Sequence, residues 1–244
     1  MSVIAERTNA KQVVLAAAGA LVRGFHFDPR EMDDKARDFV FRTVYPVGLE
    51  AFAQNPSTGM ERDIAEHLFG TSDLLVLRSD GYIRFGGTGI GRPRPIGFCV
   101  WNTYETKIGN ALYISGVCVN PSWQGNGLGR AMQQYALIHE AEKAEVKYAF
   151  MSTQNAVEKN SFDRAMGSES YPLRDGAVCS EAVVFAAERN LLDRFDPLSM
   201  KLRRHYGGAS LYGIMPENRD DGYEKLFGKL DREQGDAYLC VSRV

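Results

Sequence analysis

Residues 117–130 read VCVNPSWQGNGLGR, and the interpretation of the whole chain starts from this stretch. A short β-branched strand ends at Pro121, a loop with glycines at positions 125, 127 and 129 follows, and helical sequence comes next. A glycine-rich turn between a strand and a helix leaves backbone N–H groups unpaired at the positive end of the helix dipole. The stretch therefore predicts an anion-binding loop.

Two well-known phosphate loops do not fit the spacing. The dinucleotide fingerprint G-x-G-x-x-G fails because its third glycine falls on Arg130 when counted from Gly125, and on Met132 when counted from Gly127. A Walker loop needs Gly-Lys-Ser/Thr at the start of the helix, where this chain has Gly-Arg-Ala. The pattern that remains is Gln124-x-x-Gly127-x-Gly129, preceded by Val119-x-Pro121.

This pattern resembles the pyrophosphate loop of the GNAT superfamily of acyl-CoA-dependent N-acyltransferases, which has the form Gln/Arg-x-x-Gly-x-Gly/Ala. The alternative is that three glycines simply make a mobile turn at a helix entry. The strand, Pro121, Gln124 and a sixteen-residue amphipathic helix all stand in register, which favours the acyl-CoA loop. The resemblance implies an α/β (α+β) fold: a twisted, mostly antiparallel mixed sheet with a splayed parallel strand pair, flanked by helices.

Composition sets further bounds on the function. The chain has 244 residues, 44% hydrophobic and 25% charged, with a net charge of −2, so we expect a globular protein and no nucleic-acid partner. No run approaches the ~18 apolar residues of a membrane span, and residues 13–22 are interpreted as mature structure and not as a targeting signal. Four cysteines without ligand spacing indicate reduced thiols, no metal and a cytoplasmic location.

The order of predicted elements agrees with this fold. Expected helices cover residues 33–53, broken or bent near Pro46, 60–69 and the stretch from 130. Residues 13–27 are expected to hold a first strand with a following turn, or else a helix. Further expected strands cover residues 72–81, 95–101, 111–119 and 146–154. The last two strands are joined through a helix and should be parallel neighbours. The resemblance implies that they splay apart and admit the pantetheine arm.

The segment after residue 155 allows two alignments. In one, Asn155 opens the fourth GNAT helix over 156–166, but Phe162 stands where the family has a tyrosine. In the other, the helix is 196–206, because Asp196-Pro197 is a helix start and Gly207-Gly208 a stop. We favour the second, which resembles a GNAT subgroup with an Asp-Pro-started late helix.

This choice determines the expected domain organisation. Residues 1–244 would form a single GNAT-like domain with an insertion at 156–195, which contains an apolar helix at 177–192. The closing strands would be 210–215 and 236–244. The glycine- and arginine-rich stretch 81–95 is either a basic flap over a phosphate-bearing ligand or, as we favour, a long mobile hairpin tip.

The resemblance implies acetyl-CoA, or another acyl-CoA, as co-substrate. Backbone groups of the strand would contact the pantetheine and thioester, and the loop would hold the pyrophosphate. The implied CoA-binding residues are Val117, Cys118, Val119, Gln124, Gly125, Asn126, Gly127, Leu128, Gly129, Arg130 and Asn155. Cys118 could also be imagined as an acyl-accepting nucleophile, but a small core residue is the favoured interpretation.

Catalytic side chains are harder to assign. Many GNAT proteins place a carboxylate on the strand before Val-x-Pro, where this chain has Ser115, and the nearest acid is Glu105, which could act through water or be a solvated turn residue. Tyr206 is the candidate acid for the leaving thiolate, with a half-buried tyrosine at a helix end as its alternative role. The four histidines, at positions 26, 67, 139 and 205, are interpreted as surface or packing residues.

Three hypotheses for the function follow. The first is an N-acetyltransferase that moves an acetyl or other short acyl group from acyl-CoA to a primary amine of a small molecule by direct attack. The second is acyl transfer from an acyl carrier protein to an amino acid, with residues 84–94 meeting the carrier. The third is a non-catalytic acyl-CoA-binding or interaction module. A homodimer is left open as a further partner.

Overall fold

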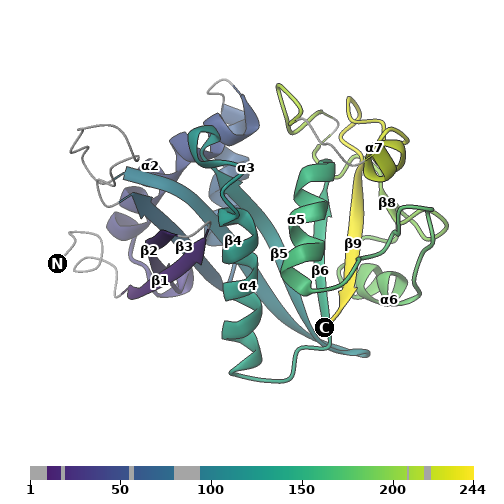
Figure 1. Ribbon diagram of the computed structural model, residues 1–244, viewed down its shortest axis with the longest axis horizontal. Coiled ribbons are helices and arrows are strands. Elements are labelled where there is room, and N and C mark those ends of the chain that lie inside the picture. The colour runs from purple at the N-terminus through teal and green to yellow at the C-terminus, as the bar shows by residue number, and fades with distance from the viewer. Residues whose placement is uncertain (1–9, 18–19, 55–57, 80–93, 208, 217–220) are drawn as a thin grey trace. The chain divides into compact units, whose positions relative to one another are not determined.

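The computed structural model describes residues 10–17, 20–54, 58–79, 94–207, 209–216 and 221–244 (Figure 1). The residues group into two compact units, one made of 1–102 and 115–135 and the other of 103–114 and 136–244. The strands follow the order β1-β2-β3-β4-β5-β6-β9-β8-β7 in a nine-stranded sheet. The pairs β1–β2, β2–β3, β3–β4, β6–β9, β8–β9 and β7–β8 are antiparallel and β5–β6 is parallel, so the expected mixed, mostly antiparallel sheet with flanking helices is confirmed.

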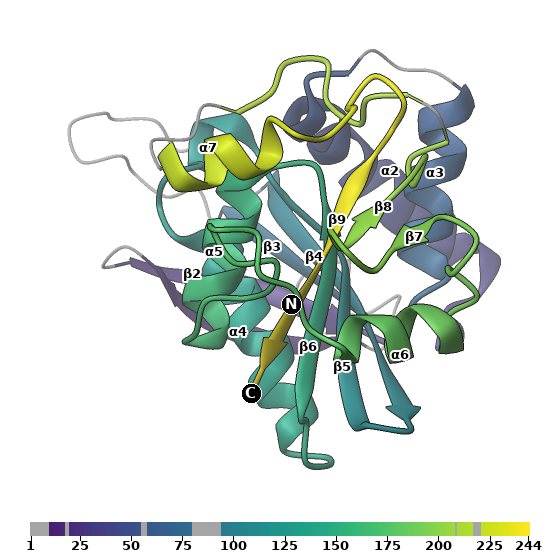
Figure 2. The same ribbon diagram turned by 90° about the vertical axis from the view of Figure 1, so that its right-hand side faces the viewer.

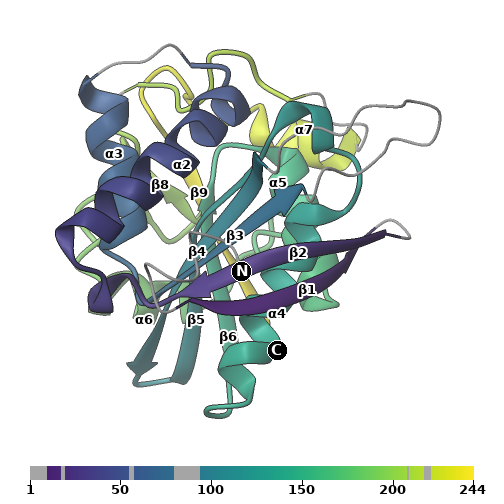
Figure 3. The ribbon, with the colours of Figure 1, turned by 90° about the vertical axis from the view of Figure 1, so that its left-hand side faces the viewer.

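The first unit begins with a β-hairpin (Figure 3). β1 (Lys11–Ala17) pairs with β2 (Ala20–Phe27), and β2 pairs in turn with β3 (Asp73–Ser79). The first strand expected within 13–27 is therefore present and the alternative helix is not, but the second strand of the hairpin was not expected. The alternation along β1, with Val13 and Leu15 buried between exposed neighbours, is the period-2 pattern of a half-buried strand.

Two helices of the first unit lie between β2 and β3 in the chain. α2 (Asp34–Phe52) begins where the Asp33 carboxylate accepts a hydrogen bond from the Ala36 N–H at 2.7 Å, which satisfies one of the free donors of the first turn. It is continuous through Pro46, so the helix is not broken there, and the alternative expectation of a bend stays a prediction. The second helix is α3 (Thr58–Phe69). The helices and strands of this unit share a core that includes Phe25, Val44, Leu68, Leu74, Phe98 and Cys118.

The second unit is built around β6 (Tyr148–Thr153) (Figure 2). Along Ala111–Ile114, β5 (Gly109–Val119) runs parallel to β6, which confirms the expected parallel neighbours. On its other side β6 pairs antiparallel with β9 (Ala237–Arg243), close to the strand expected at 236–244. Two short strands, β8 (Lys201–Leu202) and β7 (Phe195–Asp196), extend the sheet beyond β9.

Helices of the second unit pack on this part of the sheet. α5 (Ala156–Met166) contacts β6 and β9, α6 (Glu181–Glu188) contacts β9, and α7 (Asp221–Phe227) contacts α5. Phe185 of α6 stacks on Phe150 of β6 with ring centroids 3.9 Å apart. The apolar helix expected within 177–192 is thus present, and its buried side chains belong to the core of this unit.

The structure decides between the two alignments of the late segment. A helix forms at 156–166 and none forms at 196–206, so the favoured position of the late helix is wrong. The Asp196 carboxylate accepts hydrogen bonds from the Leu198 N–H at 3.0 Å and from Ser199 Oγ at 2.7 Å, in the turn between β7 and β8. An aspartate before proline stabilises such a turn as well as it starts a helix, which explains the error.

Two further expectations concern the strand at 210–215 and the basic flap at 81–95. The strand expected at 210–215 is absent, since residues 209–216 hold no strand or helix. The stretch 80–93, which contains most of the expected basic flap, lies outside the described residues, and only Arg94 of its arginines is placed, at the start of β4 (Arg94–Thr106). Among the helices that the structure describes, none has the length and apolarity to cross a bilayer.

Candidate active site

The predicted anion loop connects β5 to α4 (Leu128–Ala141) in the first unit (Figure 1). After β5 ends at Val119, Pro121–Trp123 form a single 3-10 turn. Gly125 and Gly127 then adopt left-handed backbone with φ of +77° and +73°. A Cβ at either glycine would meet nothing within 4 Å, so glycine is required here by conformation and not by lack of space.

Side-chain hydrogen bonds hold the loop in this shape. Asn120 Oδ1 accepts from the Ser122 N–H at 3.0 Å and so caps the 3-10 turn. Gln124 Nε2 donates to the Val119 carbonyl at 2.9 Å, and Asn126 Nδ2 donates to the Trp123 carbonyl at 3.1 Å. The motif glutamine therefore ties the loop back to the end of the strand, which leaves the loop backbone available for a ligand.

The N–H groups at the start of α4 have the arrangement that an anion requires. The first bond into the helix is donated by the Ala131 N–H to the Gly127 carbonyl at 2.9 Å. The N–H groups of Leu128, Gly129 and Arg130 therefore precede the intrahelical ladder, at the positive end of the helix dipole. Residues 124–127 are exposed, and Leu128 is buried. The geometry fits a pyrophosphate, whose oxygens accept several N–H bonds at once.

Strand β5 also has a stretch outside its pairing with β6. The register covers four residue pairs and ends at Ile114–Met151, whereas β5 continues to Val119. In this continuation the Cys118 side chain is 2% exposed and belongs to the core of the first unit, while Val117 and Val119 are partly exposed. Cys118 is placed as a core residue, and the contact of this strand with a pantetheine arm stays a prediction.

Asn155, a predicted CoA-binding residue, caps the start of α5. Its Oδ1 accepts from the Val157 N–H at 2.8 Å, so it is the N-cap of α5, and its own N–H donates to Thr153 Oγ1 at 2.9 Å. The residue is 5% exposed. Its predicted contact with CoA is therefore added to a capping role and does not replace it.

The three catalytic candidates lie in different surroundings. Ser115 Oγ donates to the Val100 carbonyl at 3.2 Å within the first unit. Glu105 is exposed near the end of β4, as expected of a solvated carboxylate. Tyr206 is partly buried in the second unit, where its hydroxyl donates to the Ser152 carbonyl at 3.0 Å at the end of β6. None of these arrangements identifies a base.

A carboxylate that the sequence interpretation did not single out lies beside Thr153, at the end of β6. Glu158, in the first turn of α5, accepts from Thr153 Oγ1 at 2.9 Å and from the Tyr212 hydroxyl at 3.5 Å. Burial raises the pKa of Glu158 to about 7, against the lowering effect of these two hydrogen bonds. The signal in the sequence was Asn155-x-x-Glu158, an N-cap followed at N3 by an acid.

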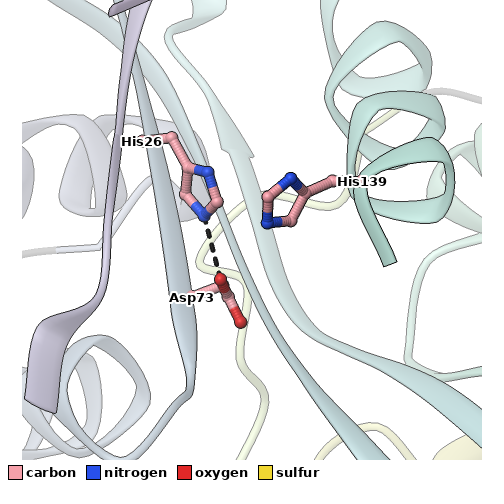
Figure 4. Close-up of side chains that lie close together, drawn as sticks. All are labelled: His26, Asp73 and His139. Atoms are coloured by element: carbon pink, nitrogen blue, oxygen red, sulfur yellow. Dashed lines mark hydrogen bonds and ion pairs between the residues drawn. The ribbon is translucent and has the colours of Figure 1, made fainter. Parts of the chain in front are cut away.

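One histidine is better partnered than the sequence suggested. His26 Nε2 lies 2.9 Å from Asp73 Oδ1 (Figure 4), and His26 Nδ1 lies 3.1 Å from the Tyr135 hydroxyl. His26 is 8% exposed and its ring lies 5.1 Å from that of the buried Trp101, centroid to centroid. His26 is therefore a buried residue, as the interpretation as a packing histidine implies, and its ring has two polar partners.

Comparison with known families now decides the assignment of the loop. Residues 54–167 match the model of the acetyltransferase (GNAT) family, and this range contains β5, the glycine loop, α4, β6 and α5. Residues 54–167, just under half of the chain, are thus similar to a GNAT acetyltransferase domain. The expected GNAT-type N-acetyltransferase is confirmed at this level, and the family supports acyl-CoA as the co-substrate of the GNAT domain.

Solved structures resemble the chain only remotely. A yellow fever mosquito (Aedes aegypti) protein with the provisional name arylalkylamine N-acetyltransferase 7 is 9% identical, over 96% of this chain and 93% of its own, with a TM-score of 0.47. The ribosomal-protein-S18-alanine N-acetyltransferase of Escherichia coli is 14% identical, over 91% and 94%, with a TM-score of 0.40. No curated protein sequence matches the chain. The GNAT assignment therefore rests on the family match and the loop.

Proposed function

We propose that the protein transfers an acetyl or other short acyl group from acyl-CoA to the primary amine of a small molecule. The observation that supports this most directly is the row of N–H groups at Leu128, Gly129 and Arg130, presented by two left-handed glycines at the start of α4. Such a row holds the pyrophosphate of the donor, and it leaves the thioester to reach the stretch of β5 beyond its pairing with β6.

The experiment compares Gly127→Glu with a matched control, Gly167→Glu. Both glycines have nearly the same φ, +73° and +77°, and a Cβ at either would meet nothing within 4 Å, so the two substitutions carry the same backbone strain. Only Gly127 lies in the loop, where a carboxylate would repel the pyrophosphate. Calorimetry should show that acetyl-CoA binds the unmodified protein and Gly167→Glu. The affinity of Gly127→Glu for acetyl-CoA should be at least about tenfold lower.

Acyl chain length and acceptor are tested by turnover. Ala182, Phe185 and Ala186 of α6 are buried in the core of the second unit, so these side chains do not offer a lining for a long acyl chain. This favours a short acyl group over the carrier-protein alternative. Thiol release from acetyl-CoA, octanoyl-CoA and an acyl carrier protein should be measured with a panel of alkylamines, aralkylamines and amino acids, and acetyl-CoA with a small amine should be fastest.

A binding module without catalysis is the second candidate. It is favoured by Ser115, which stands where a carboxylate would be expected and whose hydroxyl donates to the Val100 carbonyl. This candidate expects acetyl-CoA binding in calorimetry without thiol release for any amine in the panel. Release with a single amine, together with the acetylated product in mass spectrometry, would exclude it.

A further inference from the structure

The residue between strand β5 and the glycine loop is tied to three parts of the first unit. Asn120 is 7% exposed. Its backbone N–H donates to the Ile96 carbonyl of β4 at 2.8 Å, and its backbone carbonyl accepts from the Trp123 N–H at 2.8 Å. Its side-chain Nδ2 donates to Glu50 Oε2, in the last turn of α2. Asn120 therefore joins β4, α2 and the entry of the loop.

The Asn120 amide has one orientation that satisfies both of its ends. Its Oδ1 accepts from the Ser122 N–H at 3.0 Å. A carboxylate only accepts hydrogen bonds, so Glu50 requires the amide nitrogen on its side and leaves Oδ1 to face Ser122. A flipped amide would place two donors together at Ser122 and two acceptors together at Glu50. The Glu50 carboxylate thus orients the side-chain oxygen that caps the 3-10 turn.

This turn determines which backbone donors the loop offers to a ligand. In residues 121–124 the proline has no N–H, and the other three N–H groups donate to Asn120 Oδ1, the Asn120 carbonyl and the Pro121 carbonyl. These donors are therefore used inside the turn. The donors for a pyrophosphate begin at Gly125 and lead to the N–H row at 128–130, so the turn sets where that series starts.

An acid in the last turn of α2 does not serve the helix itself. A carboxylate there faces the negative end of the helix dipole, and no basic residue stands in that turn. Glu50 is exposed, so it does not fill the core either. Other residues of α2, Val44 and Val47, pack in the same core as Cys118 of β5. This core holds α2 against the strand, and Glu50 extends from the helix to the residue that follows the strand.

We propose that Glu50 is a positioning residue for the acyl-CoA donor. This inference rests on the proposed function. From α2, the Glu50 carboxylate holds the Asn120 amide, and the Asn120 oxygen holds the turn that leads into the pyrophosphate loop. Glu50 contacts neither the donor nor the acceptor in this scheme. All of the groups involved belong to the first unit.

The first test is Glu50→Ala, with Glu66→Ala, an exposed carboxylate on α3 of the same unit, as the control. In calorimetry, the affinity of Glu50→Ala for acetyl-CoA should be about five- to tenfold lower, because the loop has lost a hydrogen bond to a charged group. Glu50→Gln keeps an oxygen that can accept from Asn120 Nδ2, so its affinity should stay within about twofold of that of the unmodified protein. Glu66→Ala should bind as the unmodified protein does.

A double-mutant cycle tests whether Glu50 acts through Asn120. Asn120→Ser keeps a side-chain oxygen for the Ser122 N–H but has no amide nitrogen for Glu50. In that background, Glu50→Ala should not weaken acetyl-CoA binding further, because the link that it breaks is already absent. Equal losses of affinity from Glu50→Ala in the two backgrounds would overturn the proposal, since Glu50 would then act without Asn120.

Steady-state kinetics separate the donor from the acceptor. With the best amine of the panel, Glu50→Ala should raise the KM for acetyl-CoA and leave kcat and the KM for the amine unchanged. If Glu50 instead bound the acceptor ammonium by its charge, both Glu50→Ala and Glu50→Gln would raise the KM for the amine, and that result would overturn the proposal. A lower Tm of Glu50→Ala with an unchanged Kd for acetyl-CoA would overturn it as well, because Glu50 would then support only the fold.

The outcomes distinguish the inference from the proposed function. If the unmodified protein binds no acetyl-CoA and acetylates no amine, the proposed function is wrong and the inference is wrong with it. If the unmodified protein binds acetyl-CoA and Glu50→Ala binds it equally well, only the inference is overturned. If the unmodified protein binds acetyl-CoA without acetylating any amine, the proposed transfer is wrong, and the calorimetric comparison still decides the role of Glu50 in holding the donor.

Discussion

The ammonium of Lys159 lies 3.2 Å from Oδ2 of Asp163 and has no exposed surface. The same nitrogen donates to the Ser170 carbonyl at 2.8 Å and to Ser170 Oγ at 3.0 Å, and it lies 4.5 Å from the ring centroid of Tyr223. The Tyr223 hydroxyl in turn donates to Asp163. The pair thus joins α5 to α7 and to the loop at residue 170, and all its polar atoms have partners.

Removing one member of this pair should be costly. Lys159→Met would leave the Asp163 carboxylate buried without its cation, so we expect a loss of about 3–5 kcal/mol in the free energy of unfolding. The matched control is Arg42→Met, which breaks the exposed i,i+4 pair with Asp38 on α2 and should cost less than about 1 kcal/mol. Urea unfolding of the two variants measures the difference, and equal losses would contradict the prediction.

The two roles of Asn155 can be separated by two substitutions. Asn155→Ala removes the cap of α5 and should lower the free energy of unfolding by about 1 kcal/mol, whereas Asn155→Ser keeps a capping oxygen and should cost little. If the side chain also contacts CoA, the serine variant should be as stable as the unmodified protein but bind acetyl-CoA more weakly. Thermal unfolding and calorimetry together give the answer, and unchanged affinity in both variants would remove Asn155 from the CoA site.

Gln124 should matter for donor binding more than for stability. Gln124→Ala removes the exposed hydrogen bond from Nε2 to the Val119 carbonyl. Such a bond contributes about 1 kcal/mol to the ordering of the loop. We expect a roughly fivefold weaker Kd for acetyl-CoA with little change in Tm. Gln234→Ala, at another exposed glutamine, serves as the control and should bind as the unmodified protein does.

Glu158 should also make stability depend on pH. Its pKa is raised in the folded state from 4.5 to about 7, so the folded protein binds more protons between these values, and stability falls as pH rises through this window. Glu158→Gln lacks this dependence. From pH 5 to pH 8, the free energy of unfolding of the variant should therefore rise by on the order of 2–3 kcal/mol relative to that of the unmodified protein. Urea midpoints at the two pH values measure it, and a constant difference would contradict the raised pKa.

The glycine loop could be predicted from sequence because its determinants are local. Gln124, Gly127 and Gly129 act within one strand–turn–helix unit, through a positive φ, a side-chain bond to Val119 and the free donors of a first helical turn. The same holds for the capping of α2 by Asp33. Neither feature depends on distant parts of the chain.

The late segment and the surroundings of Glu158 could not be predicted in this way. The Asp196-Pro197 signal is consistent with both a helix start and a turn, and the choice depends on the pairing of β7 and β8 with β9. Glu158 reads as a capping acid in the sequence, because the burial that raises its pKa comes from residues as distant as Tyr212. Phe162, which replaces the expected tyrosine, is fully buried and packs in the interior.

The position of β9 has a consequence for synthesis on the ribosome. This strand, residues 237–243, lies between β6 and β8 in the sheet, so β6 pairs with residues that are made about 90 positions later, such as Tyr148 with Arg243. Until the residues of β9 emerge from the exit tunnel, the edge of β6 with which they pair has no partner strand on that side. The second unit therefore cannot complete its part of the sheet until the end of the chain has been made. The glycine loop at 124–130 is translated well before that point.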